Sequence, residues 1–262
     1  MIRFIACDID GTMLQNGDTA VPERLLANIR KLVDRGIVFA PASGRQYPTM
    51  KRMFGDVANE LMYICENGAL VVYKGKVLSE SIMDRETVMD IVDDILSMPA
   101  CEVLLSGRDI SYIKPKTEAY FRRIHDRIKN NICLPNDFRK LNDDFIKVAA
   151  CDTSGVVNSK DHFMEKWSDK VQTVVSGELY MDFTNKGVNK GNALLTVLDR
   201  LGISTDDAMA FGDSYNDAEM LKAVKYSYAM ADAETAVKKC AAYTTENVSS
   251  ILERIIRGDF DE

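Results

Sequence analysis

The segment Phe4-Ile5-Ala6-Cys7-Asp8-Ile9-Asp10-Gly11-Thr12 decides the fold, because it joins a strand-length apolar run to a turn with two carboxylates. In an extended chain residues two apart point to the same face, so we expect Asp8 and Asp10 side by side where the strand ends. Adjacent carboxylates repel unless a proton or a cation lies between them, and Mg²⁺ suits oxygen ligands. Gly11 permits a sharp turn, and Thr12 adds a hydroxyl. The alternative interpretation is a polar turn after a strand.

Alternating strand and helix patterns follow this segment. Apolar runs at 37–42 and 61–65 predict strands, and the spacing at 22–35 and 47–54 predicts helices. Similar patterns return near the end, with helices at 189–201 and 248–256 and strands at 208–212 and 226–230. The sequence therefore predicts an α/β protein with a Rossmann-like parallel sheet and helices on both faces.

The middle of the chain has a different organisation. Strand patterns at 101–105, 146–151, 171–175 and 179–183 alternate with helical spacing around 88–96, 120–128 and 162–167, without a glycine-rich phosphate loop. We therefore expect a separate α+β module at 84–182, inserted into a first domain formed by 1–83 and 183–262.

A second acidic turn, Gly212-Asp213-Ser214-Tyr215-Asn216-Asp217, follows the apolar strand pattern that ends at Phe211. Ligands of open parallel sheets bind at the carboxyl ends of the strands, where both acidic turns lie. Asp213 is therefore a candidate for a third carboxylate that faces the metal. The alternative is that Asp213 or Ser214 caps the following helix.

Two further segments are candidates for phosphate binding. Ser43-Gly44-Arg45 ends the second strand, where a hydroxyl and a guanidinium suit a phosphate group. Lys190 stands at the start of the helix at 189–201, from which its ammonium could reach a phosphate or a carboxylate. The alternatives are a helix cap at Ser43, a structural ion pair at Arg45 and a solvated charge at Lys190.

Together the four segments resemble the signatures of the haloacid-dehalogenase superfamily of phosphotransferases, in the same order, over essentially the whole chain. The size and position of the insert are similar to the Cof-type branch with a type IIB cap, as is Glu66-Asn67-Gly68-Ala69 after the third strand. One departure is Ser43, where many relatives carry threonine; the hydroxyl is kept.

This resemblance implies roles for the motif residues. Asp8 would be the nucleophile that forms an aspartyl-phosphate, and Asp10 the general acid and base. Mg²⁺ would be held by the Asp8 carboxylate, the Asp10 backbone carbonyl and the Asp213 carboxylate. Ser43 and Lys190 would bind the phosphoryl group. Supporting or phosphate-binding positions would be Gly11, Thr12, Gly44, Arg45, Asn216 and Asp217, and possible substrate contacts would be Glu66 and Asn67.

Composition excludes several classes of protein. The net charge of −7 argues against a general nucleic-acid binder. The sequence contains no run of about 20 apolar residues, so a membrane span is not expected. The N-terminus does not resemble a signal peptide, and the six cysteines are scattered, which is typical of reduced thiols in the cytoplasm. Only two histidines are present, so a zinc site of His and Cys is not expected.

The leading hypothesis is a Mg²⁺-dependent phosphatase of small phosphorylated metabolites, with sugar phosphates as the first expected class. Flavin mononucleotide and pyridoxal phosphate are alternative substrates, and a sugar phosphomutase is an alternative activity of the same residues. A third hypothesis is a sensor that binds a phosphorylated metabolite without turnover. The expected partner is a small phosphate ester, with neither nucleic acid nor membrane; the sequence does not distinguish a monomer from a weak homodimer.

Overall fold

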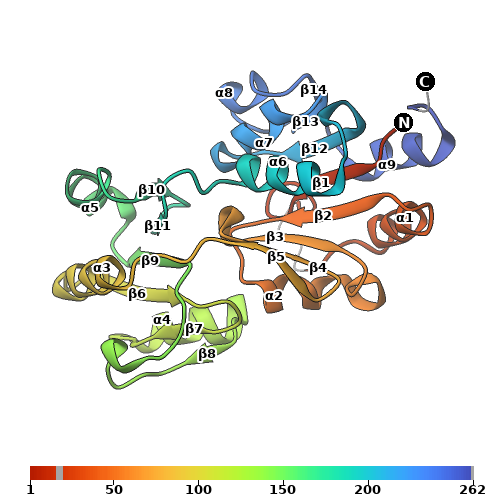
Figure 1. The fold of residues 1–262 in the computed structure, drawn as a ribbon. Coiled ribbons are helices and arrows are strands. Elements are labelled where there is room, and N and C mark those ends of the chain that lie inside the picture. The colour runs from red at the N-terminus through yellow and green to blue at the C-terminus, as the bar shows by residue number, and fades with distance from the viewer. Residues whose placement is uncertain (16–19, 261–262) are drawn as a thin grey trace. The chain divides into compact units, whose positions relative to one another are not determined.

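The computed structural model describes residues 1–15 and 20–260, which form two compact units. The first, the core unit, comprises Met1–Gly44, Met50–Ser79 and Asn189–Glu262. The second, the inserted unit, comprises Arg45–Thr49 and Glu80–Val188. Each unit has its own sheet (Figure 1).

The sheet of the core unit has eight strands and is mainly parallel. In spatial order they are β14 (Tyr243–Thr245), β13 (Tyr226–Met230), β12 (Ala208–Gly212), β1 (Phe4–Asp8), β2 (Val38–Ala42), β3 (Met62–Cys65), β4 (Leu70–Tyr73) and β5 (Lys76–Glu80). β1 lies between β12 and β2, and all five of its residues are buried. A strand buried on both faces explains the continuous apolar run Phe4–Cys7.

Helices complete the core unit. They are α1 (Glu23–Asp34), α2 (Tyr47–Lys51, shared with the inserted unit), α6 (Lys190–Leu201), α7 (Ala218–Ala223), α8 (Thr235–Lys238) and α9 (Val248–Arg257). The β1–α1–β2 and β12–α7–β13 crossovers advance across the sheet in opposite directions, and right-handed crossovers of that kind place their helices on opposite faces. The prediction of an α/β core with a parallel sheet is confirmed.

The structure differs from the sequence-based expectation in two places. The helix expected over 47–54 ends at Lys51 and continues as a 3₁₀ turn, η1 (Arg52–Val57), because Gly55 has a φ of +53° and leaves the helical conformation. The antiparallel edge strands β4 and β5 were not predicted. They are joined through Lys74 and Gly75, both with positive φ, and Lys-Gly is a weaker hairpin signal than Asn-Gly.

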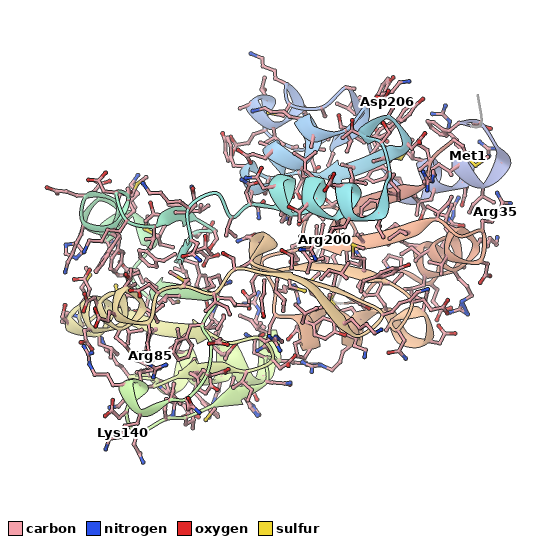
Figure 2. The ribbon with its side chains drawn as sticks, in the orientation of Figure 1. Met1, Arg35, Arg85, Lys140, Arg200 and Asp206 are labelled. Carbon is pink, nitrogen blue, oxygen red and sulfur yellow. The ribbon has the colours of Figure 1, made fainter. Side chains whose placement is uncertain are left out.

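The inserted unit has a six-stranded sheet with helices. Its strands, in spatial order, are β10 (Gln172–Val175), β11 (Tyr180–Thr184), β9 (Lys147–Asp152), β6 (Cys101–Ser106), β7 (Ser111–Ile113) and β8 (Ile132–Cys133). Its helical segments are α3 (Arg85–Ser97), α4 (Glu118–Arg122), the π-helical turn η3 (Arg123–Ile128) and α5 (Lys160–Trp167), with short 3₁₀ turns η4 (Phe138–Lys140) and η5 (Val156–Asn158). Arg85, at the start of α3, donates to the carbonyls of Arg139 and Leu141 and so holds the η4 segment, where Lys140 lies (Figure 2).

No helix within residues 1–15 and 20–260 combines the length and apolar character that a bilayer crossing requires.

Asp94 on α3 is one of the buried carboxylates of the inserted unit. Its oxygens accept from Lys166 Nζ at 2.6 Å and Trp167 Nε1 at 2.8 Å, and His162 Nε2 lies 3.1 Å away. Burial alone would raise the pKa of Asp94, but these donors outweigh it and the pKa is lowered from 3.8. The charged form of Asp94 therefore stabilises the fold.

We expect Asp94→Asn to lower the free energy of unfolding by about 1–3 kcal/mol near neutral pH, because a charged acceptor of several hydrogen bonds is lost. An acid with a depressed folded pKa stabilises above its unfolded pKa, and this contribution disappears as the pH falls through the folded pKa. Urea denaturation over a pH series should therefore show the two proteins converging below pH 3.8.

Asp93→Asn is the matched control, because the neighbouring Asp93 side chain is 58% exposed and pairs with Arg139. An exposed pair contributes about 0–1 kcal/mol, so this variant should unfold close to wild type. Equal losses in the two variants would contradict a special role for Asp94.

Candidate active site at the carboxyl ends of the core strands

Asp8 ends β1 at the centre of the core sheet. The strand register places it opposite Ala42, the last residue of β2, and places Cys7 opposite Phe211 on β12. The residues that follow these strands, Ser43 and Asp213, therefore emerge on either side of Asp8. This is the edge at which open parallel sheets bind ligands.

Lys190 is the centre of the charge network. It is 0% exposed, and its Nζ donates to Asp8 Oδ1 at 2.5 Å and to Asp217 Oδ1 at 2.7 Å. Burial by itself lowers the pKa of a lysine, but the Asp217 and Asp8 carboxylates outweigh that effect and raise the pKa of Lys190. The ammonium is therefore charged at neutral pH. The interpretation of Lys190 as a solvated surface charge is excluded.

Asp217 has both carboxylate oxygens engaged. While Oδ1 accepts from Lys190, Oδ2 accepts from the backbone N–H groups of Asp213 at 3.0 Å and Ser214 at 3.1 Å. Asp217 thus orients Lys190 and closes the loop after β12. Of the two residues considered as caps of the following helix, Ser214 has that role: its side chain accepts from the Asp217 N–H, and the Asp217 carboxylate accepts from the Ser214 N–H.

Asp8, Asp213 and Asp217 form an oxygen-only cluster. One carboxylate oxygen from each lies within 4.8 Å of the others. Thr12 Oγ1 donates to Asp213 Oδ1 at 2.9 Å, which fixes that side chain. Three carboxylates share a single ammonium, so the described cluster carries an excess of negative charge.

The pKa values of two carboxylates in the cluster are raised. Burial first, and then the negative charge of Asp217, raise the pKa of Asp8 well above its ordinary value of 3.8. Burial also raises the pKa of Asp213. Asp8 Oδ2 is buried and has no hydrogen-bond partner within residues 1–15 and 20–260. A carboxylate oxygen left bare in such a site fits a cation ligand or a nucleophile.

Glycines make this crowding possible. A Cβ on Gly11, whose φ is +93°, would lie 2.3 Å from Asp213 Oδ2. A Cβ on Gly212 would lie 2.4 Å from Asp217 Cβ. Both positions thus require glycine so that the backbone can approach the acidic side chains.

Asp10 and Arg45 are placed differently from the cluster. β1 ends at Asp8, so Asp10 lies in the turn, where its side chain is exposed. Its backbone pairs with Leu14 in an isolated bridge, and its carboxylate is not part of the cluster described above. Arg45 belongs to the inserted unit, whereas Ser43 and Gly44 belong to the core unit.

The turn Glu66–Gly68 joins three of the motif segments. Asn67 N donates to the Ser43 carbonyl at 3.0 Å, and Asn67 Oδ1 accepts from Asn216 Nδ2 at 3.0 Å. Gly68 packs so closely on the chain that a Cβ there would lie 2.5 Å from the Asn189 carbonyl oxygen, directly before Lys190.

This turn also carries backbone strain. Glu66 and Asn67 have φ values of +49° and +56°, which side chains with a Cβ rarely adopt, and Gly68 has +99°. Such strain persists where surrounding contacts over-determine a conformation.

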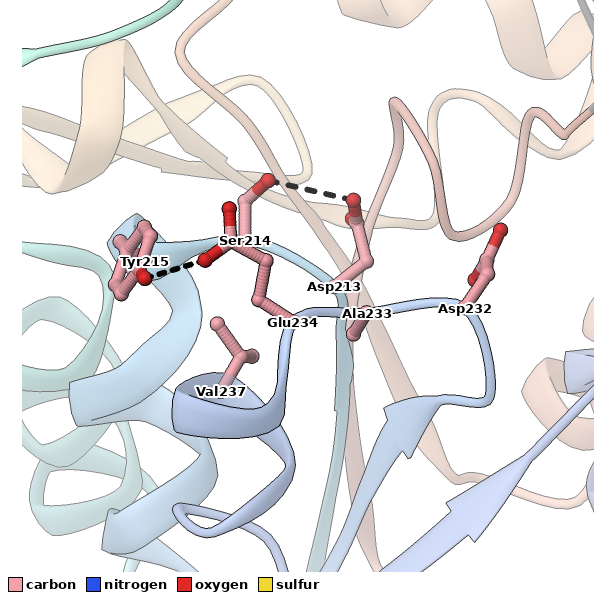
Figure 3. A pocket seen from close by; sticks show the side chains of 7 residues that line it. All are labelled: Asp213, Ser214, Tyr215, Asp232, Ala233, Glu234 and Val237. Atoms are coloured by element: carbon pink, nitrogen blue, oxygen red, sulfur yellow. Dashed lines mark hydrogen bonds between the residues drawn. The ribbon is translucent and has the colours of Figure 1, made fainter.

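A pocket of about 230 Å³ lies beside Asp213 (Figure 3). Its acidic lining includes Asp232 and Glu234, and Tyr215 donates to Glu234 at 2.5 Å. Such a lining attracts cations and repels free anions. The sequence analysis did not single out Asp232, which lies beyond the end of β13 with Ala231 between them.

Cys7 is fully buried beside Asp8, and burial raises the pKa of its thiol well above the ordinary value. This supports the prediction that Cys7 packs in the core and does not act as a nucleophile.

Comparisons with known proteins agree with the geometry. The pattern that describes the haloacid dehalogenase-like hydrolases matches residues 5–251. The chain is 28% identical to 5-amino-6-(5-phospho-D-ribitylamino)uracil phosphatase YbjI of Escherichia coli (strain K12), over 100% of this chain and 99% of that protein. The structure of SMU.1108c from Streptococcus mutans UA159 is similar with a TM-score of 0.84 and 32% identity, over 100% of both chains. That of the subclass IIB sugar phosphatase BT4131 shares the fold, with a TM-score of 0.82 and 19% identity over 97% of this chain and 98% of that one.

The position of Asn67 predicts a kinetic effect. Asn67→Gly keeps the backbone conformation but removes the amide that binds Asn216, so we expect the kcat for p-nitrophenyl phosphate hydrolysis to fall about 3- to 10-fold, with a smaller change in KM. Asn67→Ala should lose stability as well, because alanine disfavours a φ of +56°.

Lys74→Gly is the matched control, since Lys74 has a φ of +49° in the β4–β5 hairpin. It should retain the wild-type kcat. A wild-type kcat in Asn67→Gly would show that the amide has no positioning role.

Proposed function

Because the chain belongs to the haloacid dehalogenase-like hydrolases, we propose that it is a Mg²⁺-dependent phosphatase of small phosphorylated metabolites that acts through an aspartyl-phosphate. Sugar phosphates are the first class of substrate. The observation that carries the proposal is the state of Asp8, whose Oδ1 is held by Lys190 while its buried Oδ2 has no hydrogen-bond partner among the described residues. One oxygen is thus fixed, and the other is available to react.

The reaction proceeds in two transfers. Asp8 Oδ2 attacks phosphorus, the bond from phosphorus to the alcohol oxygen breaks, and Asp10 gives a proton to the leaving alcohol. Asp10 then takes a proton from a water molecule, which attacks the aspartyl-phosphate and releases inorganic phosphate and the free Asp8 carboxylate. The Ser43 hydroxyl and the Lys190 ammonium bind the phosphoryl oxygens and offset their charge.

The residues fit a divalent cation, because three clustered carboxylates exceed the single ammonium of Lys190 and favour additional positive charge. We assign the Asp8 carboxylate, the Asp10 carbonyl and the Asp213 carboxylate as the Mg²⁺ ligands. When bound, the ion supplies positive charge against the phosphoryl group. Asp217 stays with Lys190, since both of its oxygens are already engaged.

We assign the inserted unit as a cap that selects the leaving alcohol and excludes water during reaction. We place the protein in the cytoplasm, because its six free cysteines suit a reducing compartment.

The nucleophile is tested first. Asp8→Asn should lower the release of phosphate from p-nitrophenyl phosphate and from sugar monophosphates by a factor on the order of 10⁴ or more, because the attacking oxygen is lost. Excess EDTA should abolish wild-type activity, and Mg²⁺ should restore it. The exposed Asp206→Asn is the matched control and should keep full activity (Figure 2).

Product analysis separates the alternatives. Free phosphate with the dephosphorylated alcohol is the expected result, and the ranking of sugar phosphates, flavin mononucleotide and pyridoxal phosphate tests the substrate class. An isomeric phosphate without net release would replace the proposal with a mutase. Binding without any turnover would replace it with a sensor.

Metal binding has a readout that does not depend on turnover. Mg²⁺ at about a hundredfold excess over its Kd should stabilise the wild-type protein by about 2.7 kcal/mol, measured as a rise in Tm. Asp213→Asn should reduce that rise strongly, because it removes a proposed ligand. Asp232→Asn is the matched control from the neighbouring pocket and should retain most of it. Equal rises in all three proteins would remove Asp213 from the proposed ligand set.

A further inference from the structure

Strand β10 (Gln172–Val175) forms one edge of the six-stranded sheet of the inserted unit, and β11 is its one neighbouring strand among the described residues (Figure 1). An edge strand presents backbone N–H and C=O groups that a further strand can bind, and proteins protect such edges with charged residues, proline or short length. β10 carries neither a charge nor a proline, since its sequence is Gln-Thr-Val-Val.

The other sheet edges in the described part of the chain are better protected. β8, at the far edge of the same sheet, has two residues, and β14, at one edge of the core sheet, has three. β5, at the other edge of the core sheet, begins with Lys76, and the carbonyl of its Leu78 accepts from Arg200. β10 is therefore the edge at which pairing with another strand meets the least obstruction.

The hydrogen-bond pattern of the β10–β11 pair decides which backbone groups face the free edge. Opposite residues of an antiparallel pair alternate between those that exchange hydrogen bonds and those that do not. Ser176 N donates to the Tyr180 carbonyl at 3.0 Å, so the exchanging residue two positions earlier, within β10, is Val174. Thr173 and Val175 therefore direct their N–H and C=O groups away from β11, towards the free edge.

These two outward residues make the edge self-complementary. When a second copy runs antiparallel to the first with Val174 on a two-fold axis, Thr173 of one copy lies opposite Val175 of the other. Both residues face the free edge, so such a pair can exchange both of its hydrogen bonds, and the axis generates the pair twice. A shift by one residue would set an outward residue against an inward one and remove the pairing.

The charges that flank β10 favour the same register. Lys170 stands before the strand and Glu178 stands after it, at equal separations from Val174 along the chain, and both side chains are exposed. The two-fold axis at Val174 therefore brings Lys170 of each copy to the Glu178 end of the other. Opposite charges across paired strands stabilise the pairing, whereas like charges destabilise it.

Exposed apolar side chains border this edge on one face of the sheet. Val175 lies opposite Met181 of β11 and so shares its face, where Met181 packs in the main apolar core. On that face α5 packs against β10, and η5 packs against α5. Val175, Met164 of α5 and Val157 of η5 are nevertheless 44%, 45% and 66% exposed. A strand paired with β10 would cover Val175.

We propose that β10 is the contact surface for a second copy of this chain, which pairs antiparallel through its own β10 about a two-fold axis at Val174. The occupant is a second copy because one symmetric register satisfies the outward backbone groups and the flanking charges together. The pairing joins two six-stranded sheets into one continuous sheet. A strand of four residues gives a small interface, so the dimer is concentration-dependent. This inference is independent of the proposed function.

Exchange of the flanking charges tests the proposal with little risk to folding, because both side chains are exposed. Sedimentation velocity over a concentration series should show the wild-type protein passing from monomer to dimer. Lys170→Glu and Glu178→Lys should each raise the Kd of the dimer about 5- to 30-fold, because each places like charges together twice about the axis. The double variant restores opposite charges and should return the Kd close to the wild-type value.

Lys140→Glu is the matched control, because Lys140 is an exposed lysine of the same unit that lies in η4, outside β10 and its flanking turns. It changes the net charge as Lys170→Glu does and should leave the Kd unchanged. An equal rise in Kd for Lys140→Glu and Lys170→Glu, or a double variant that stays as weak as the single variants, would overturn the proposal.

A backbone substitution tests the hydrogen bonds. Val175→Pro removes an N–H that the β10–β11 pair does not use, and edge strands tolerate proline where the N–H faces outward. We expect the Kd to rise more than about 10-fold, while the Tm measured in dilute solution stays close to that of the wild type. Val175→Ala keeps the N–H and should remain much closer to the wild-type Kd.

Two further results would contradict the inference. A wild-type protein that stays monomeric at every concentration would show that β10 does not bind a second copy, whatever other chain it pairs with. A dimer whose Kd is unchanged by Lys170→Glu, Glu178→Lys and Val175→Pro would form through another surface. Either result would overturn the proposal and leave the proposed function untouched.

Discussion

The buried ammonium of Lys190 is the interaction on which the core unit depends. A charge with no solvent contact is tolerated only when it is paired and hydrogen-bonded, and Lys190 meets that condition through Asp8 and Asp217. These partners stand 182 and 27 residues away along the chain, so one charge requires the end of β1, the start of α6 and the loop after β12 to meet. Removal of both carboxylates would leave an uncompensated charge in the interior.

The close approach of acidic groups follows from that arrangement. Gly11 and Gly212 lack the side chains that would collide with Asp213 and Asp217, so backbone and carboxylates pack at contact distance. Burial first, and then the neighbouring negative charge, raise the pKa values of Asp8 and Asp213, and a bound cation would offset that charge. The strained turn at Glu66–Gly68 is part of the same arrangement. It forms hydrogen bonds with Ser43 and Asn216 and packs against the residue before Lys190.

The inserted unit follows a different principle. Its carboxylate Asp94 is satisfied by three donors, and its main core is apolar, so this part of the unit is built for stability. The second face of its sheet combines a smaller apolar cluster with buried polar side chains such as Ser106 and Lys147.

The α/β core could be predicted from local patterns, because buried parallel strands and amphipathic helices have periodicities that are local along the chain. It also identified Asp8, Asp213 and Lys190 as candidates, since their types and their places after strands or at a helix start can be recognised within a few residues. Only the tertiary structure decided that Lys190 is a buried partner of two carboxylates, that Asp217 is engaged on both oxygens, and that Asp232 borders the site. Strand pairing in the inserted unit was equally unpredictable, because Ser106, Ser111 and Lys147 become neighbours only through the register of the sheet. Burial and partnership depend on residues distant along the chain, and no local pattern encodes them.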